Sequence, residues 1–112
     1  MTRRIVLLII LSLPLLAADI SGKWNFKIDL GGQNGEPTFT FQQKGEELTG
    51  TYSGQLGEAK LQGTVKGDKV EFQFETSGIA VIYKGTVTSG TSMKGTADYG
   101  GQAQGSWTAK KE

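Results

Sequence analysis

The sequence predicts an all-β protein: an eight-stranded antiparallel up-and-down barrel preceded by an N-terminal signal peptide. Three observations carry this prediction. Apolar and polar residues alternate from residue 19 onward, which is the period of a strand with one buried face. Turn residues recur at intervals of about ten residues. A glycine stands at the same point of five separate segments, each time followed by Thr or Ser.

The first 18 residues have the three parts of a secretory signal. Two arginines precede an apolar run over residues 5–16, and Ala17 and Ala18 follow it. The run is shorter than the roughly 18–20 residues that span a bilayer as a helix. We therefore expect removal of residues 1–18 and export of the domain 19–112 to the periplasm or the exterior, with an uncleaved membrane anchor as the alternative.

The first strand shows the alternation most clearly. Trp24, Phe26, Ile28 and Leu30 alternate with polar residues, which predicts a half-buried strand over 23–30. A turn-rich loop follows over Gly31–Pro37. The remaining strands are expected, by the same alternation, at 39–41, 48–52, 59–65, 70–75, 81–87, 93–99 and 103–109.

The connections between these segments are all short, and turn residues occupy each of them, as in Lys66-Gly67-Asp68-Lys69. Short local connections favour a meander of neighbouring antiparallel strands. Eight such strands close best as a barrel, because closure removes both exposed sheet edges.

The recurrent glycines fall on the inward face of this alternation. Glycine allows a strongly coiled strand to bend, and it leaves space for an aromatic ring from across the barrel. We therefore interpret the glycines as a closure device, which is compatible with a small cavity for a ligand. They are Gly50, Gly63, Gly85, Gly95 and Gly105.

Composition argues against most catalytic and nucleic-acid functions. The chain has no Cys and no His, so thiolate and imidazole chemistry is absent. Without Arg3 and Arg4, ten lysines stand against 11 acidic residues, and this balance does not give the basic face that nucleic acids or anionic membranes need. The glutamates lie on turns or on outward strand faces. We expect no enzyme activity, no cofactor, no metal site, no nucleic-acid partner and no membrane association after signal removal.

Aromatic residues are the remaining site candidates. Tyr and Trp need a polar partner when buried, so three inward tyrosines suggest a wet barrel mouth as well as a filled core. An eight-stranded barrel has room for side chains or for one small ligand. The leading hypothesis is an exported binding protein for a small apolar or aromatic ligand at one barrel mouth. Its expected wall residues are Phe41, Tyr52, Phe72, Tyr83, Tyr99 and Trp107.

A second hypothesis comes from another class of protein. A barrel filled by its own side chains would act as a protein-interaction module, such as a secreted protease inhibitor or an envelope accessory protein. The loop Gly31–Pro37 or the N-terminal segment would then contact the partner protein. An open interior cavity favours the ligand, and a packed interior with an exposed apolar patch favours the partner.

Gly22-Lys23-Trp24 on the first strand, with a basic residue near the end of the last, resembles the calycin pattern of lipocalins, fatty-acid-binding proteins, avidins and small bacterial inhibitors. The resemblance implies that the tryptophan packs under a basic side chain of the final strand, here Lys110 or Lys111, and closes the barrel bottom. Segments ISGKWNF and GEELTGTYSG are similar to avidins, but Phe26 replaces their ligand-contacting Asn, so biotin binding is not implied.

Overall fold

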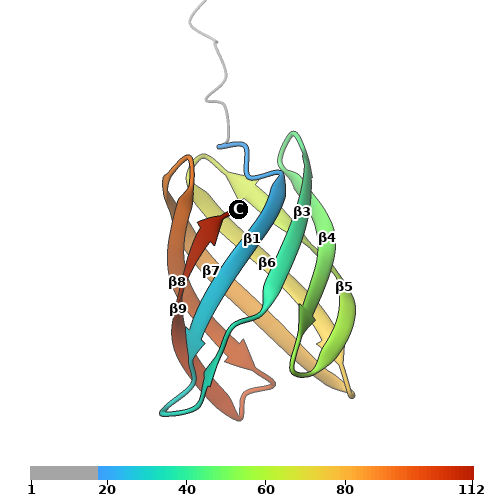
Figure 1. The fold of residues 1–112 in the computed structure, drawn as a ribbon. Coiled ribbons are helices and arrows are strands. Elements are labelled where there is room, and N and C mark those ends of the chain that lie inside the picture. Colours follow the sequence, from blue (N-terminus) through green and yellow to red (C-terminus); the bar gives the residue numbers. More distant parts are fainter. Residues whose placement is uncertain (1–17) are drawn as a thin grey trace, which may run out of the picture.

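The computed structural model describes residues 18–112 and shows a closed antiparallel β-barrel (Figure 1). The predicted signal peptide, apart from Ala18, lies outside the described residues. The strands are β1 (Gly22–Asp29), β2 (Asn34–Gly35), β3 (Thr38–Lys44), β4 (Glu47–Gly54), β5 (Gly57–Lys66), β6 (Lys69–Thr76), β7 (Ile79–Ser89), β8 (Ser92–Tyr99) and β9 (Ala103–Lys111).

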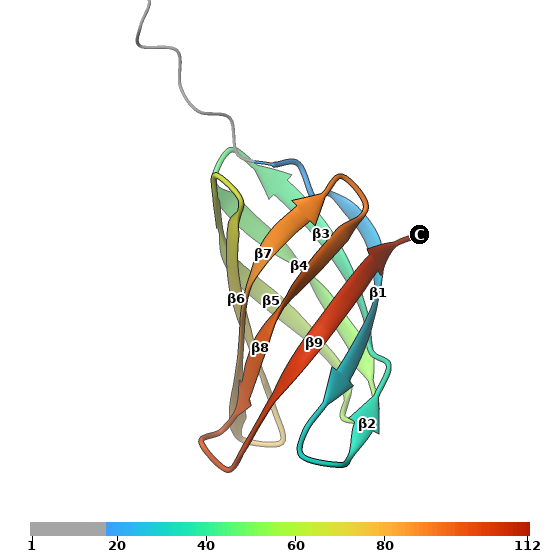
Figure 2. The ribbon, with the colours of Figure 1, turned by 90° about the vertical axis from the view of Figure 1, so that its left-hand side faces the viewer.

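The topology confirms the predicted fold class. Each strand from β3 to β9 pairs with the next, and β1 pairs with both β3 and β9, so eight strands form the ring (Figures 1 and 2). The loop 31–37 differs from expectation in one respect: it contains the two-residue strand β2, which folds back on β1 through Ile28–Gly35 and Asp29–Asn34 pairs. In residues 18–112, no helix is long and apolar enough to cross a membrane.

The core confirms that the bulky residues share one face of the wall. Every ring on β1, β3 and β6 is almost fully buried, and the intervening residues of these strands are mostly exposed. Among residues 18–112 the buried core is entirely apolar or aromatic. Its largest fully buried side chains are Trp24, Trp107, Tyr83, Phe26, Phe39, Phe41 and Phe72.

The recurrent glycines lie where neighbouring strands approach too closely for a side chain. A Cβ on Gly50, Gly63, Gly95 or Gly105 would collide with a backbone carbonyl of the adjacent strand. A Cβ on Gly85 would lie 2.6 Å from the Trp107 ring. For three of the five glycines the pairing shows an aromatic residue directly opposite, since Gly50 lies opposite Phe41, Gly63 opposite Phe72 and Gly95 opposite Trp107. The interpretation of these glycines as a closure device is confirmed.

One end of the barrel, where β1 begins and β9 finishes, is closed by residues that precede β1. Ala18 N–H donates to the Gly67 carbonyl (3.0 Å) in the β5–β6 turn, and Ile20 N–H donates to Gln43 Oε1 (2.9 Å) on β3. The chain therefore crosses this end, and Ile20 fills it with a buried side chain. The sequence pattern assigns Ile20 no such role. We call this the closed end.

Trp24 locks the same end. Its indole Nε1–H donates to the Ile20 carbonyl at 2.9 Å, and the ring is fully buried. Lys111 on β9 pairs with Trp24 across the closure, and its Cε lies 2.9 Å from the point that a Cβ on Gly22 would occupy. Lys111, and not the outward-facing Lys110, therefore covers the start of β1.

Candidate functional site

The open end is the opposite end of the barrel, where β2, the 55–56 turn and the 100–102 turn lie (Figure 2). It holds a hollow of about 610 Å³ that is open to solvent. Leu30, Pro37, Leu56 and Ala103 give it apolar walls, and the rings of Tyr52 and Tyr99 line it from β4 and β8. This hollow combines apolar walls with a few polar groups, as small-molecule sites do.

The structure separates the six predicted wall residues into two groups. Tyr52 and Tyr99 line the hollow, and Tyr83 lies behind them with its hydroxyl on the Tyr99 hydroxyl. Phe41, Phe72 and Trp107 belong to the middle of the barrel instead and do not line it. All six point inward, but inward position alone does not place a residue at a mouth.

The middle of the barrel is filled by packed rings. Phe41 and Phe72 lie 5.1 Å apart between ring centroids, and Phe39 lies 5.1 Å from Phe72. Phe26 contacts Phe39 at 4.5 Å and Trp107 at 4.8 Å. These spacings are those of directly packed aromatic pairs. A ligand at the open end would therefore rest on this aromatic layer and would not pass through it.

Trp107 is held as a core residue. Its indole Nε1–H donates to the Thr96 carbonyl at 2.8 Å, and its ring covers Gly85 on β7. The glycine removes the side chain that would otherwise occupy the place of the ring. Trp107 therefore stabilises the wall from within, and its polar atom already has a partner.

The hydroxyls of Tyr52, Tyr83 and Tyr99, which we call the hydroxyl cluster, lie at the open end of the barrel. Tyr83 Oη and Tyr99 Oη lie 2.5 Å apart, and Tyr52 Oη accepts a hydrogen bond from Leu56 N–H at 3.3 Å. Burial raises the pKa of the Tyr83 hydroxyl far above its ordinary value, and the neighbouring Tyr99 raises it further. Burial also raises the pKa of Tyr99, although its hydrogen bond with Tyr83 lowers the pKa in part. Tyr83 and Tyr99 therefore keep their hydroxyl protons at neutral pH.

The raised pKa values predict a loss of stability in alkali. The unfolded chain releases these protons near pH 10, and the folded chain retains them, so the free energy of unfolding falls as pH rises above about 10. The stability that the two hydroxyls contribute is complete below pH 10. It is lost as the pH rises toward their higher pKa values in the folded chain. We expect urea midpoints to drop between pH 9 and pH 11, and to drop less in Tyr83→Phe. An equal drop in both proteins would contradict this, since lysines titrate in both.

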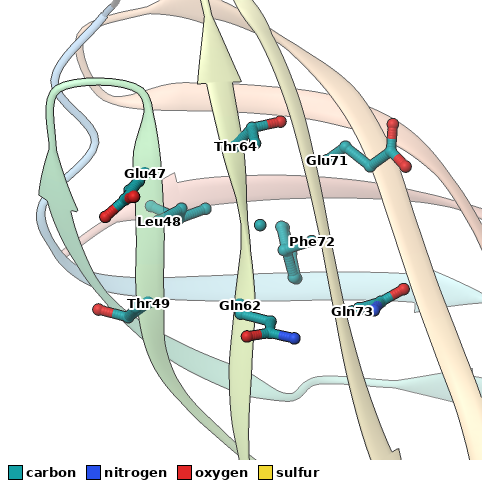
Figure 3. Close-up of a pocket in the computed structure, with 9 residues that line it drawn as sticks. Glu47, Leu48, Thr49, Gln62, Thr64, Glu71, Phe72 and Gln73 are labelled. Carbon is teal, nitrogen blue, oxygen red and sulfur yellow. The ribbon is translucent and has the colours of Figure 1, made fainter.

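The outer wall carries other hollows, of which one of about 500 Å³ lies over β4, β5 and β6 (Figure 3). It forms beside Gly63, the point at which β5 approaches β6 too closely for a side chain. Glu47 and Glu71 lie on either side of Thr64, as expected for outward residues in register (Figure 3). Within residues 18–112, no group of three or more His, Cys, Asp or Glu could hold a metal ion.

Sequence reasoning misses several residues of the open end. The alternation places Leu30 on the first strand but not in the site, and it places Pro37 and Leu56 only in turns. Leu56 carries a usable signal, because it is an apolar residue within a turn. It is 41% exposed and is the one large hydrophobic side chain in residues 18–112 that is exposed. Pro37 carries none, since its place in the wall follows from the path of the β2 loop.

No protein-family model and no curated protein matches this chain. Among solved structures, the redesigned β-barrel b11L5F_LGL is similar in fold, with a TM-score of 0.75, 17% identity, and coverage of 90% of this chain and 98% of that one. The redesigned barrel mFAP0, solved bound to DFHBI, gives a TM-score of 0.64 at 21% identity, with coverage of 82% and 98%. A de novo designed fluorescence-activating barrel gives 0.62 at 16%, with coverage of 83% and 94%. At these identities the likeness shows the fold alone.

Proposed function

We propose that this chain is an exported, non-catalytic binding protein that takes one small apolar or aromatic ligand at the open end. The observation that carries the proposal is the contrast between the two ends. Ile20 and Trp24 close one end, whereas the other holds a hollow of about 610 Å³ between apolar walls and tyrosine rings. A barrel whose only content is its own packed side chains does not require an open hollow at one end.

Two further observations support a ligand. The described hollow presents one carboxylate, Glu36, and no cation, which suits an uncharged molecule better than an anion. Two of the designed barrels that share this fold, mFAP0 and EF1p2_mFAP2b, were solved bound to DFHBI. Barrels of this fold have therefore been solved with a small molecule bound. The proposal includes no reaction, because phenols, one carboxylate and amides form no evident nucleophile and base pair.

We also propose calycin kinship, which rests on Gly22-Lys23-Trp24 and on the position of Lys111. The lysine stem covers Gly22, and the residue pairs with Trp24, as the resemblance implies for the basic residue of the last strand. Export rests on the N-terminal sequence. Sequencing the N-terminus of protein secreted by its own host would test it, and a chain that begins at Met1 would contradict removal of the signal.

Binding is tested by titration with the uncharged fluorescent probe N-phenyl-1-naphthylamine. We expect saturable fluorescence enhancement with a Kd of about 1–100 µM. Ala103→Phe puts a ring into the hollow and should weaken binding at least about tenfold. Ala80→Phe adds the same ring to the exposed outer face of β7 and serves as the matched control. Absence of binding, or equal binding by the two variants, would contradict the proposal.

A partner protein is the second candidate, and one observation favours it. Leu56 is exposed at the rim of the open end, beside the loop that contains β2. The packed interior also agrees with a filled interaction module. A photo-crosslinking residue at Gln33, in protein produced by its own host, would capture a defined partner in this case. The same residue would give no discrete crosslinked product if the open end binds only small molecules.

A further inference from the structure

The hydroxyl cluster has unused donors. Tyr83 and Tyr99 share a single hydrogen bond, which consumes one of their two hydroxyl hydrogens. Tyr52 Oη accepts from Leu56 N–H, and within residues 18–112 its own hydrogen has no acceptor. Two O–H groups at this end are therefore available for another molecule.

The two donors face the same space. When Tyr83 donates to Tyr99, the free hydroxyl hydrogens are those of Tyr52 and Tyr99, and both residues line the hollow. Tyr52 is itself almost fully buried, so its hydroxyl lies at the inner wall of the hollow and has little contact with bulk water. A buried donor without an acceptor costs about 1–3 kcal/mol, which favours any molecule that supplies one.

The charge around the cluster restricts the kind of acceptor. Glu36 is the charged residue of the hollow, and no lysine lines it. An anion would lose its hydration and would gain no opposite charge, which is unfavourable in a partly enclosed site. A neutral acceptor loses less hydration and can take both O–H donors.

The apolar walls restrict the rest of the molecule. Leu30, Pro37, Leu56 and Ala103 can contact carbon atoms but offer no side-chain hydrogen bonds. The Tyr52 ring stacks on Phe74 at 4.3 Å between centroids with a 15° interplanar angle, so packing holds the ring whose hydroxyl the ligand would meet. Such walls suit a planar ring inserted edge-first toward the hydroxyls.

We infer that the open end selects planar aromatic molecules that carry an uncharged hydrogen-bond acceptor, such as a carbonyl oxygen, and that Tyr52 and Tyr99 donate to this acceptor while Tyr83 orients the Tyr99 hydroxyl. The inference rests on the proposed function and adds the chemical class of the ligand. It separates three molecules of nearly equal shape: an aromatic ketone, the hydrocarbon in which CH2 replaces the carbonyl oxygen, and the corresponding carboxylate.

The test compares 2-acetylnaphthalene, 2-isopropenylnaphthalene and 2-naphthoate as competitors of N-phenyl-1-naphthylamine. We expect the ketone to bind about three- to tenfold more tightly than the hydrocarbon, as a neutral hydrogen bond predicts. The carboxylate should bind more weakly than the ketone. Equal binding of the ketone and the hydrocarbon, or tighter binding of the carboxylate, would overturn the inference while the proposed function still holds.

Variants identify the donors. The triple variant Y52F/Y83F/Y99F removes every hydroxyl of the cluster and should reduce the ketone preference over the hydrocarbon to about one. Ser53→Ala removes a hydroxyl from the exposed face of β4 next to Tyr52 and should keep the preference. If the triple variant does not fold, Tyr52→Phe alone must lower the preference. A preference that survives these changes contradicts the assignment, and failure of all three competitors and of the fluorescent probe contradicts the proposed function as well.

Discussion

Gly95→Ala is expected to destabilise the barrel by about 3 kcal/mol or more, toward the upper end of what overpacking costs. Gly95 lies on β8 between Gly85 on β7 and Trp107 on β9. A Cβ there would collide with the Lys84 carbonyl oxygen and would lie 2.5 Å from the Gly85 Cα. Both obstacles are backbone atoms of a paired strand, so no rotamer change can relieve the contact.

The matched control for this variant is Gly90→Ala in the β7–β8 turn. No atom lies within 4 Å of a Cβ at Gly90, and its φ is not positive. We expect its free energy of unfolding to stay within about 0.5 kcal/mol of the parent. Urea denaturation followed by tryptophan fluorescence measures both variants. If Gly95→Ala were as stable as Gly90→Ala, the strand would not need glycine at its closest approach.

Trp24→Ala is expected to cost about 3–5 kcal/mol, the range for truncating a buried tryptophan. The ring is fully buried at the closed end, and its loss leaves a cavity beneath Ile20. The Ile20 carbonyl also loses its indole donor, so the segment that crosses the barrel end loses both packing and its hydrogen bond. The closed end should become accessible to solvent.

Two further variants separate packing from hydrogen bonding at Trp24. Trp24→Phe restores most of the apolar volume but not the donor, and should cost about 1–3 kcal/mol through the unpaired Ile20 carbonyl. Asn25→Ala changes the exposed neighbour on β1 and should be nearly neutral. Urea denaturation gives the free energies, and amide exchange at Ile20 reports on the closed end. Similar stability of Trp24→Ala and Asn25→Ala would show that Trp24 does not lock the fold.

Much of the fold could be predicted because the pattern of each strand indicates its own inward face. Trp24, Phe26 and Ile28 alternate with exposed residues, and the structure buries all three. The glycines could be interpreted for the same reason, since the alternation of residues along each strand placed them on the inward face of the barrel. Strand β2 could not be predicted, because two residues carry no period and its pairing with Ile28 depends on the path of the whole loop.

The candidate site was predicted only in part. The alternation along a strand separates inward from outward side chains, but it does not say how far along the barrel axis each side chain lies. Phe72 and Tyr52 both point into the barrel. Phe72 packs against Phe39 and Phe41 in the middle, whereas Tyr52 reaches the hollow. Height depends on strand stagger, which is set by the register of all eight strands together.

The sequence by itself determined the strand period, the inward face and the bending points, because these depend on residues two positions apart and on the size of single side chains. The tertiary structure decided which end is closed and which tyrosines meet. Ile20 closes one end because Gln43 and Gly67 hold its segment across the barrel, and the Tyr83–Tyr99 contact requires β7 and β8 to pair in one register. Such long-range contacts depend on the register of all eight strands together, which no local pattern encodes.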